Sequence, residues 1–266
     1  MANDGGNLIL NDENELKQYI SKEPEGEKFI RPYIGSDELI NNYNRYCFWL
    51  DGIHPQEFRT FPELISRIEK VRKHRSSSTR IATQKLADTP YLFGEIRHCD
   101  TQILVIPRVS SENRKYIPLK FLPSNFIVND RCAFIKNATL YDFGVLTSIM
   151  HMTWVKTICG RLKSDYNYSS SIVYNNFPWP NKPLQRQIEN VEKAAKSVLD
   201  IRDRYPNSSL ADLYDPLTMP QPLLRAHNNL DKMVDLCYRK MKFNNEVSRV
   251  EFLFKFYEEI LYGFMK

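Results

Sequence analysis

The chain has 266 residues, which is enough for one large domain or two smaller ones, and we expect two. Its 37 Lys and Arg residues exceed its 32 Asp and Glu residues, and its 42% hydrophobic content favours a packed globular protein over a disordered one. No apolar run approaches the roughly 20 residues of a membrane-spanning helix, and the N-terminus lacks the pattern of a signal peptide, so we expect a cytoplasmic protein.

The positive charge is concentrated in the middle of the chain. Residues 1–28 hold seven acidic and three basic residues, whereas residues 29–180 hold 20 basic and 13 acidic ones. The segment RIEKVRKHRSSSTRIATQK, residues 67–85, has seven Lys or Arg residues against one Glu. Such a run is either a solvated helix face or a contact for a polyanion, and the sequence leaves both readings open.

The first half of the chain predicts a linker and then two helices. The acidic, polar residues 1–28 are interpreted as a linker or the tail of an upstream domain. Residues 36–50 have an N-cap candidate in Ser36 and apolar residues at helical spacing, so they predict a helix. A second helix is predicted over residues 61–75, with Pro62 near its start and the basic residues mostly outside its apolar stripe.

The second half changes from short apolar runs to long helical periodicity. Runs such as QILVIP, NFIVN and CAFIK predict a sheet from about residue 91, and residues 140–160 predict a buried helix that Gly160 terminates. SIVY predicts a strand before NNFPWP, and residues 181–266 predict a helical domain. The predicted fold class is α+β, with a mixed helix and sheet domain over residues 29–180 followed by that helical domain.

The cysteines and histidines do not predict a metal site. The five cysteines are odd in number and widely spaced, without a CxxC pair or a histidine at metal-ligand spacing. We therefore expect buried free thiols, and no metal ligands in this chain.

The segment Asn176-Phe177-Pro178-Trp179 is similar to the catalytic tetrapeptide of DNA amino-methyltransferases, in which a polar residue and a backbone carbonyl accept hydrogen bonds from a flipped base. Such enzymes also need closely spaced glycines beside S-adenosylmethionine, and this sequence contains no GxG. Phe177 also replaces the first proline of the motif. The segment is therefore interpreted as a structural turn, and no catalytic residue is predicted.

Other catalytic motifs are also missing from the sequence. It contains no GxSxG elbow, no phosphate-binding Walker loop, no HExxH and no nuclease cluster of the PD…(D/E)xK type. This favours a recognition module over an enzyme.

Several long segments in order give the chain a resemblance to a known family. They are DGGNLIL, IRPYIGSDELINNYNRYCFWL, VIPRVSSENRKYIP, FGVLTSIMHMTWVKTICGRLKSDYNYSSSIVYNNFPWP, SLADLYDPLTMP and LLRAHNNLDKMVD. Together they resemble the C-terminal part of the MmeI-like type IIL restriction-modification enzymes. Members combine a nuclease, a helical connector, an adenine-N6 methyltransferase, a target recognition domain and a C-terminal helical region. This chain resembles the last two, so residues 1–28 become the tail of the methyltransferase domain.

The resemblance implies a set of residues that read DNA bases. In the family, the segment after GRL varies with the base recognised, and here it holds Lys163, Asp165 and Asn167. A Lys can donate to guanine while an Asp accepts from the paired cytosine, and an Asn can contact adenine. Lys163 and Asp165 would point the same way on an extended backbone, because residues i and i+2 of a strand share a face. A surface ion pair between Lys163 and Asp165 is the alternative. The loop Asn129, Asp130 and Arg131 is the second base-recognition candidate that the resemblance implies.

A further set of residues is predicted to position the protein on the phosphate backbone without specifying sequence. It comprises Arg72, Lys73, Arg75, Arg80, Ser110, Ser111 and Arg114. The expected partners are double-stranded DNA and, in cis, upstream methyltransferase and nuclease domains. No cofactor is expected in this chain, and S-adenosylmethionine and Mg²⁺ are expected for the full-length enzyme. A small stand-alone methyltransferase that uses NNFPWP and a protein-interaction fragment without DNA binding stay open as alternatives.

Overall fold

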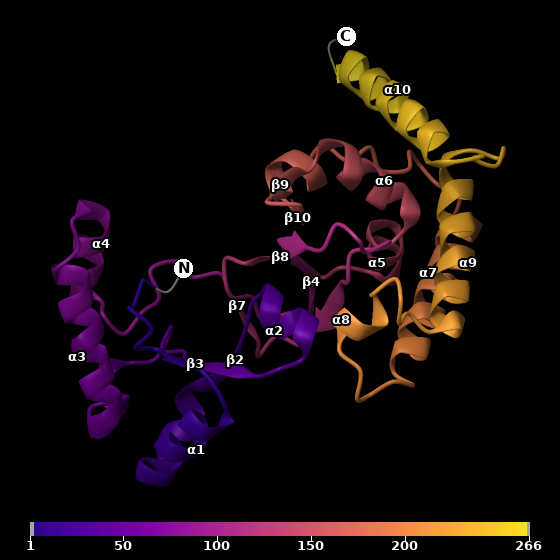
Figure 1. The fold of residues 1–266 in the computed structure, drawn as a ribbon. Helices are drawn as coiled ribbons and strands as arrows, with labels where there is room; N and C mark the ends of the chain where they lie inside the picture. The colour runs from indigo at the N-terminus through magenta and orange to yellow at the C-terminus, as the bar shows by residue number, and fades with distance from the viewer. Residues whose placement is uncertain (1–2, 265–266) are drawn as a thin grey trace. The chain divides into compact units, whose positions relative to one another are not determined.

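The computed structural model describes residues 3–264 and divides into two compact units (Figure 1). The first unit comprises Met1–Thr101 and Leu122–Cys132, and the second comprises Gln102–Phe121 and Ala133–Lys266. Both units combine helices with small sheets, so the α+β architecture predicted from the sequence is confirmed. Among residues 3–264, no helix is both long and apolar enough to span a bilayer.

The first unit is built on a four-stranded sheet in the order β1-β3-β2-β7. β3 is antiparallel to β1 and β2, whereas β7 is parallel to β2. The strands are β1 Ile9–Leu10, β2 Ile30–Ile34, β3 Arg45–Phe48 and β7 Ile127–Val128. The helices are α1 Glu13–Lys22, α2 Ser36–Asn41, α3 Pro62–Ser76 and α4 Ile81–Lys85, with 3₁₀ turns at Pro24–Phe29, Pro55–Glu57 and Leu86–Asp88.

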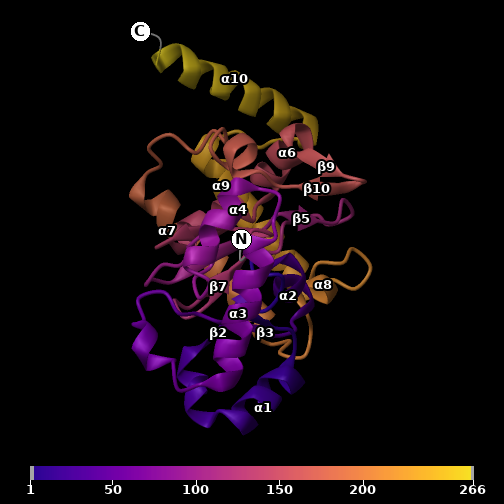
Figure 2. The same cartoon turned by 90° about the vertical axis from the view of Figure 1, so that its left-hand side faces the viewer.

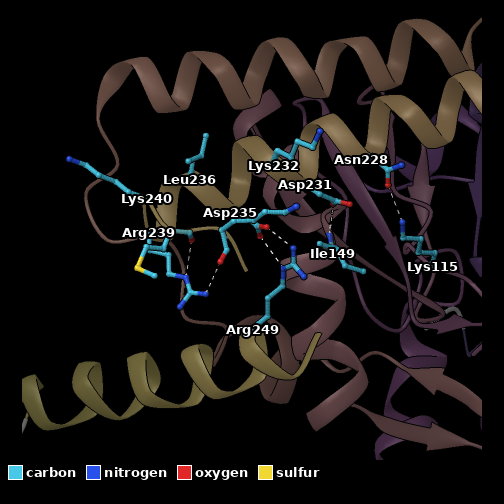
Figure 3. Close-up of a pocket in the computed structure, with 12 residues that line it drawn as sticks. Lys115, Ile149, Asn228, Asp231, Lys232, Asp235, Leu236, Arg239, Lys240 and Arg249 are labelled. Carbon is cyan, nitrogen blue, oxygen red and sulfur yellow. Dashed lines mark hydrogen bonds and ion pairs between the residues drawn. The ribbon is translucent and has the colours of Figure 1, made fainter. Parts of the chain in front are cut away.

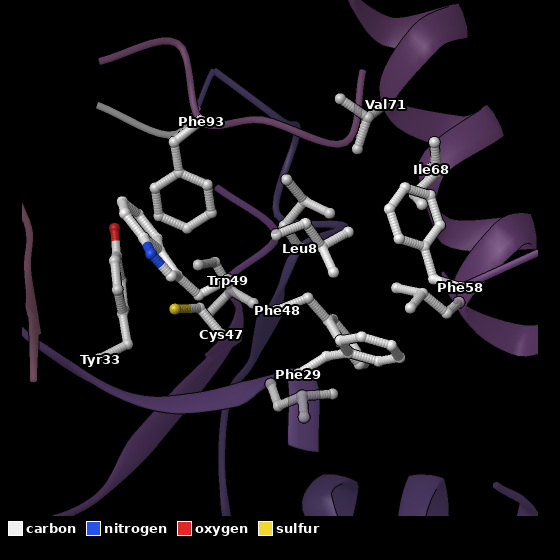
Figure 4. Packing of buried hydrophobic residues seen from close by; sticks show 14 of the residues in the cluster. Leu8, Phe29, Tyr33, Cys47, Phe48, Trp49, Phe58, Ile68, Val71 and Phe93 are labelled. Carbon is white, nitrogen blue, oxygen red and sulfur yellow. The ribbon is translucent and has the colours of Figure 1, made fainter. Parts of the chain in front are cut away.

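The core of the first unit includes the segment that the sequence predicted to be a linker. Leu8 and Leu10 are fully buried, β1 pairs with β3, and Tyr19 packs edge-on against Phe48 at 4.7 Å between ring centroids. Figure 4 shows Leu8 among the aromatic side chains of this core. The polar composition of residues 3–28 hid a short apolar strand, so this stretch is part of the folded unit.

The helix predicted over residues 36–50 is much shorter in the structure. α2 ends at Asn41, and Asn42 takes a left-handed conformation with φ of 56°, which is a common way to terminate a helix. The chain then returns as strand β3, in which Cys47 and Phe48 are buried. The apolar residues of this stretch match a helical spacing, but Asn42 divides them between a helix and a strand.

The second unit contains two three-stranded sheets and most of the helices. The sheet orders are β5-β10-β9 and β6-β4-β8. The strands are β4 Ile103–Pro107, β5 Val109–Ser110, β6 Lys120–Leu122, β8 Cys132–Lys136, β9 Gly160–Leu162 and β10 Asp165–Asn167. The helices are α5 Leu140–Leu146, α6 Ile149–Ile158, α7 Gln185–Arg202, α8 Leu210–Leu213, α9 Gln221–Tyr238 and α10 Glu246–Phe264, and Ser170–Tyr174 forms a π-helical turn.

The helices of the second unit pack through small and β-branched residues. α7 and α9 lie side by side (Figure 1). Gly144 of α5 allows a close approach to α7, because a Cβ atom at that position would lie 2.7 Å from Val191 Cγ1.

The buried helix predicted over residues 140–160 is interrupted, since Ser148 caps a new helix by accepting from the His151 amide. Gly160 opens strand β9 instead of ending a helix.

The structure also places the cysteines and the segment before NNFPWP. Four cysteines are buried free thiols as predicted, whereas Cys99 is half-buried. SIVY, predicted as a strand, lies in the π-helical turn, where the Asn175 amide donates to the Ser170 carbonyl at 2.9 Å.

Candidate nucleic-acid interface

The segment predicted to read bases forms an antiparallel hairpin in the second unit. β9 and β10 are joined by Lys163 and Ser164, and β5 pairs with the other side of β10 (Figure 2). Asp165 lies opposite Leu162, and Asn167 lies opposite Gly160. The hairpin therefore presents the predicted residues on a short β-ribbon.

Alternation along β10 separates a polar face from a buried one. Residues two apart on a strand share a face, so Asp165 and Asn167 project together, with Leu162 beside them. Tyr166 projects to the opposite face and is only 3% exposed, whereas Asn167 is exposed. Burial of Tyr166 fixes the face on which Asp165 and Asn167 stand.

Arg161 holds the hairpin in this orientation. Its guanidinium lies 4.0 Å from the centroid of the Tyr166 ring. Tyr166 is the residue directly opposite Arg161 on β10. Nη1 donates to the Ser164 carbonyl at 3.0 Å and lies 3.9 Å from the Glu112 carboxylate. A cation over an aromatic face and a bond to the turn both stabilise the ribbon. The sequence reading missed Arg161, because its partner Tyr166 can be identified only once the strand register is known.

The backbone at Lys163 differs from the extended conformation that the sequence reading assumed. Lys163 has φ of 56° and lies in the turn, with its side chain exposed. Lys163 is therefore not on one extended strand with Asp165, and these two residues do not share a strand face. Asp165 and Asn167 of β10 do share one.

Asp165 is half-buried beside the loop that follows β5. Its Oδ1 accepts weakly from the Glu112 amide at 3.4 Å. Arg114 lies in the same loop, and burial lowers the pKa of its guanidinium while the Asp165 and Asp215 charges act in the opposite direction. The Asp165 carboxylate therefore stands next to a cation that is partly removed from water.

The two serines predicted to contact phosphate are largely used within the fold. Ser110 is 4% exposed and lies opposite Tyr166 in the sheet, so its burial contradicts the predicted phosphate contact. The Ser111 hydroxyl is half-buried and accepts from the Asn113 amide at 3.3 Å.

The second base-recognition candidate, Asn129 to Arg131, belongs to the first unit. The Asn129 Oδ1 accepts from the Arg131 amide at 2.8 Å, and the Asn129 carbonyl accepts from Arg97 Nη1 at 3.1 Å. Asp130 is half-buried, and Arg131 is exposed. The loop is therefore held by its own side chain, and it presents Arg131 to solvent.

The basic helix α3 divides its arginines between solvent and core. Lys73 is exposed, and the Arg72 side chain is 48% exposed. Arg80, which lies beyond this helix at the start of α4, is also exposed. Arg75 is fully buried and donates to backbone carbonyls of four residues, so the predicted phosphate contact is wrong for Arg75. Its position four residues after the buried Val71 continues the apolar stripe, and this spacing is the signal that could have revealed its burial.

The NNFPWP segment uses its polar groups for internal contacts. The Asn176 amide donates to the Ser171 and Ile172 carbonyls at 3.0 and 2.9 Å. The Pro178 carbonyl accepts from the Tyr238 hydroxyl at 2.9 Å, and Phe177 is 4% exposed. The Asn176 Oδ1, the side-chain oxygen that a methyltransferase would direct at a base amino group, accepts from the Tyr257 hydroxyl at 3.4 Å. The polar groups of this segment therefore have partners within the fold.

Comparison with known proteins shows the same two parts that the sequence resemblance indicated. Residues 1–181 match the family described as MmeI, target recognition domain, and residues 183–265 match the family described as MmeI, C-terminal domain. DNA methyltransferase A of Bacillus subtilis (strain 168) is 40% identical over 260 residues, which are 98% of this chain and 29% of that protein.

A solved structure of the type IIL restriction-modification enzyme MmeI in complex with DNA matches with a TM-score of 0.94 and 44% identity. The match covers 97% of this chain and 34% of that one, so the chain spans about a third or less of the length of either relative. These findings confirm the family resemblance. The chain belongs to the MmeI family and consists of that family's target recognition and C-terminal domains.

Proposed function

We propose that this chain is the DNA sequence-recognition module of a restriction-modification enzyme. The observation that carries this proposal is the close match, over nearly the whole chain, to MmeI, an enzyme whose structure holds DNA. The β9–β10 hairpin supports it, because a two-stranded ribbon with a polar face can enter the major groove, where each base pair presents a distinct pattern of donors and acceptors.

The proposed readers of bases stand on or next to that ribbon. Asp165 would accept from the amino group of cytosine, Lys163 would donate to the paired guanine from the turn, and Asn167 would contact adenine. Arg131, with its neighbours Asn129 and Asp130, is proposed as a second reading element. Arg72, Lys73, Arg80, Ser111 and Arg114 are proposed to contact phosphates.

The chemistry of the full enzyme is proposed to belong to parts that this chain does not contain. By analogy with the family, an adenine-N6 methyltransferase domain would use S-adenosylmethionine, and a nuclease domain would use Mg²⁺. Both would act in cis on the site that this module selects. The chain itself is proposed to need no cofactor.

The proposal is tested by selection from a pool of duplexes with a randomised stretch. The chain is mixed with the pool at fixed salt, and the bound fraction is sequenced. We expect one shared motif, because a module that reads bases discriminates by about 1–3 kcal/mol per base pair. A bound pool that keeps the composition of the input would refute sequence recognition. Loss of all salt-dependent DNA binding would instead favour a protein-interaction fragment.

Replacing Asp165 by Asn should relax the preference at one base pair of the selected motif. The amide both donates and accepts, so it loses the preference of a carboxylate for the cytosine amino group. We expect a loss of about 1–3 kcal/mol, roughly 5- to 150-fold, against that base pair only. Dissociation constants for duplexes with each base pair at each position measure it.

Asp203→Asn is the matched control for this variant. Asp203 is an exposed acid at the C-terminal end of α7, outside the ribbon and the loop beside it. It should leave the base preferences unchanged. If Asp165→Asn keeps the wild-type preference at every position, Asp165 does not read a base.

The isolated chain should transfer no methyl group to DNA. Asn176 and the Pro178 carbonyl already have intramolecular partners, and the sequence has no glycine-rich turn for S-adenosylmethionine. Incubation with radiolabelled S-adenosylmethionine and the selected duplex should leave the DNA unlabelled. Label incorporated above the level of a heat-denatured sample would support the stand-alone methyltransferase.

A further inference from the structure

A basic pocket lies in the second unit, apart from the hairpin residues. It has a volume of about 620 Å³ and is lined by the C-terminal half of α9, the segment that follows it, the start of α10, and residues 115 and 149 (Figure 3). Six of its lining residues are basic, namely Lys115, Lys232, Arg239, Lys240, Lys242 and Arg249, against two aspartates. No sequence run revealed it, because these residues are spread over more than 130 positions of the chain.

Both aspartates in the pocket are already engaged. Asp235 accepts from Arg249 through both carboxylate oxygens, at 2.6 and 3.1 Å. Asp231 accepts from the Tyr116 hydroxyl at 2.7 Å and from the Ile149 amide at 2.8 Å. Asp235 is therefore paired with Arg249, and the Asp231 charge interacts with Lys115.

Three of the six cations bind groups of the fold. Arg239 donates to the Met241 and Lys242 carbonyls, Arg249 pairs with Asp235, and Lys115 donates to the Asn228 amide oxygen at 3.1 Å. Among residues 3–263, no carboxylate pairs with Lys232, Lys240 or Lys242. Figure 3 shows Lys232 and Lys240 extending outward from the pocket. Their uncompensated charges form a field that favours an anion.

The pocket also has apolar surface next to these charges. Leu236 is 43% exposed and Met241 is 77% exposed, and both line the pocket. A ligand that fits must combine negative charge with apolar area. The backbone of DNA does so, because its phosphates alternate with deoxyribose rings, and flexible lysines bind phosphates as point charges.

We infer that this pocket, whose lining comes mostly from the C-terminal domain, binds the phosphodiester backbone of DNA, as a contact that adds affinity without reading sequence. The inference rests on the proposed function, since it gives the second domain a part in holding the same duplex. The observation that carries it is the set of Lys232, Lys240 and Lys242, which have no carboxylate partner in the part of the chain that the structure describes, beside the apolar Leu236 and Met241.

The test replaces the three lysines together by glutamine, K232Q/K240Q/K242Q. Each phosphate contact contributes about 0.9 to the slope of log affinity against log salt, so the slope should flatten by about 2–3. Affinity should fall about tenfold or more at 0.15 M salt, equally for the selected and a shuffled duplex. The control K136Q/K193Q/K255Q removes the same charge from exposed positions outside the pocket and should retain the wild-type slope.

The outcomes separate this inference from the proposed function. If wild type binds DNA in a salt-dependent way and the pocket variant matches the control, the pocket does not contact DNA and the inference is overturned. If wild type shows no such binding, both proposals fail. A variant that keeps the wild-type slope but loses binding to poly-glutamate would assign the pocket to an acidic protein and overturn the DNA contact. Thermal unfolding of both variants checks that they are folded.

Discussion

Replacing Arg75 by Met is expected to lower the free energy of unfolding by about 3–5 kcal/mol. The guanidinium is fully buried and donates to the carbonyls of Asn3, Leu86, Thr89 and Leu92, at distances from 2.7 to 3.0 Å. Methionine fills a similar volume but removes the donor from the Asn3 and Leu92 carbonyls, whereas the Leu86 and Thr89 carbonyls still accept from the Thr89 and Leu92 amides. A buried group left without a partner costs about 1–3 kcal/mol. Denaturant unfolding of wild type and variant measures the difference.

Lys73→Met is the matched control for this loss of stability. Lys73 stands on the same helix with its side chain exposed. Substitution of such an exposed residue usually changes the free energy of unfolding by no more than about 0.5 kcal/mol, so this variant should unfold close to wild type. If Arg75→Met loses no more than the control, the carbonyls find other partners and Arg75 does not hold the segment that follows α3.

The stability of wild type relative to Asp231→Asn should depend on pH. Burial raises the pKa of Asp231 from 3.8 to about 6. A raised pKa means that the folded state binds the proton more tightly than the unfolded state. The stabilisation is therefore fully present below pH 3.8 and is lost as pH rises through about 6. Wild type should lose about 3 kcal/mol relative to the variant across this window.

Asparagine suits this comparison because its amide can accept from the Ile149 amide and donate to the Tyr116 hydroxyl without carrying charge. Asp212→Asn is a control of opposite sign, since hydrogen bonds from Ser209 lower the pKa of the exposed Asp212 carboxyl. There, wild type should lose stability relative to the variant as pH falls. The differences in unfolding free energy are measured between pH 3 and 8, because the Asp212 effect lies below its ordinary pKa of 3.8. A pH-independent difference for Asp231→Asn would show that its pKa is not raised.

The sequence predicted those helices whose apolar residues recur at helical spacing along one continuous segment. The stripe Leu64, Ile68 and Val71 gave α3, and the same periodicity gave α7 and α10. Elements that depend on distant partners were missed. β1 is only two residues long, and its strand character comes from pairing with β3 nearly 40 residues later. SIVY has the composition of a strand but adopts a π-helical turn, because local hydrogen bonds hold it.

The candidate interface was predictable in its residues but not in its geometry. The family resemblance and side-chain chemistry nominated Asp165 and Asn167, and the structure places both on one face of β10. The turn at Lys163 could not be predicted from the sequence. Lysine rarely takes a left-handed conformation by its own preference, and here the hairpin register imposes it. The burial of Arg75 and the assembly of the basic pocket likewise depend on tertiary packing, which brings together residues far apart in the chain.

The most direct test of sequence recognition is the ratio of two dissociation constants for the wild-type chain at the same salt concentration. One duplex carries the motif obtained by selection, and the other has the same base composition in shuffled order. Phosphate contacts contribute equally to both duplexes, so the ratio isolates the reading of bases. A recognition module should bind the selected duplex about 10³-fold more tightly or better. A ratio near one would contradict the account.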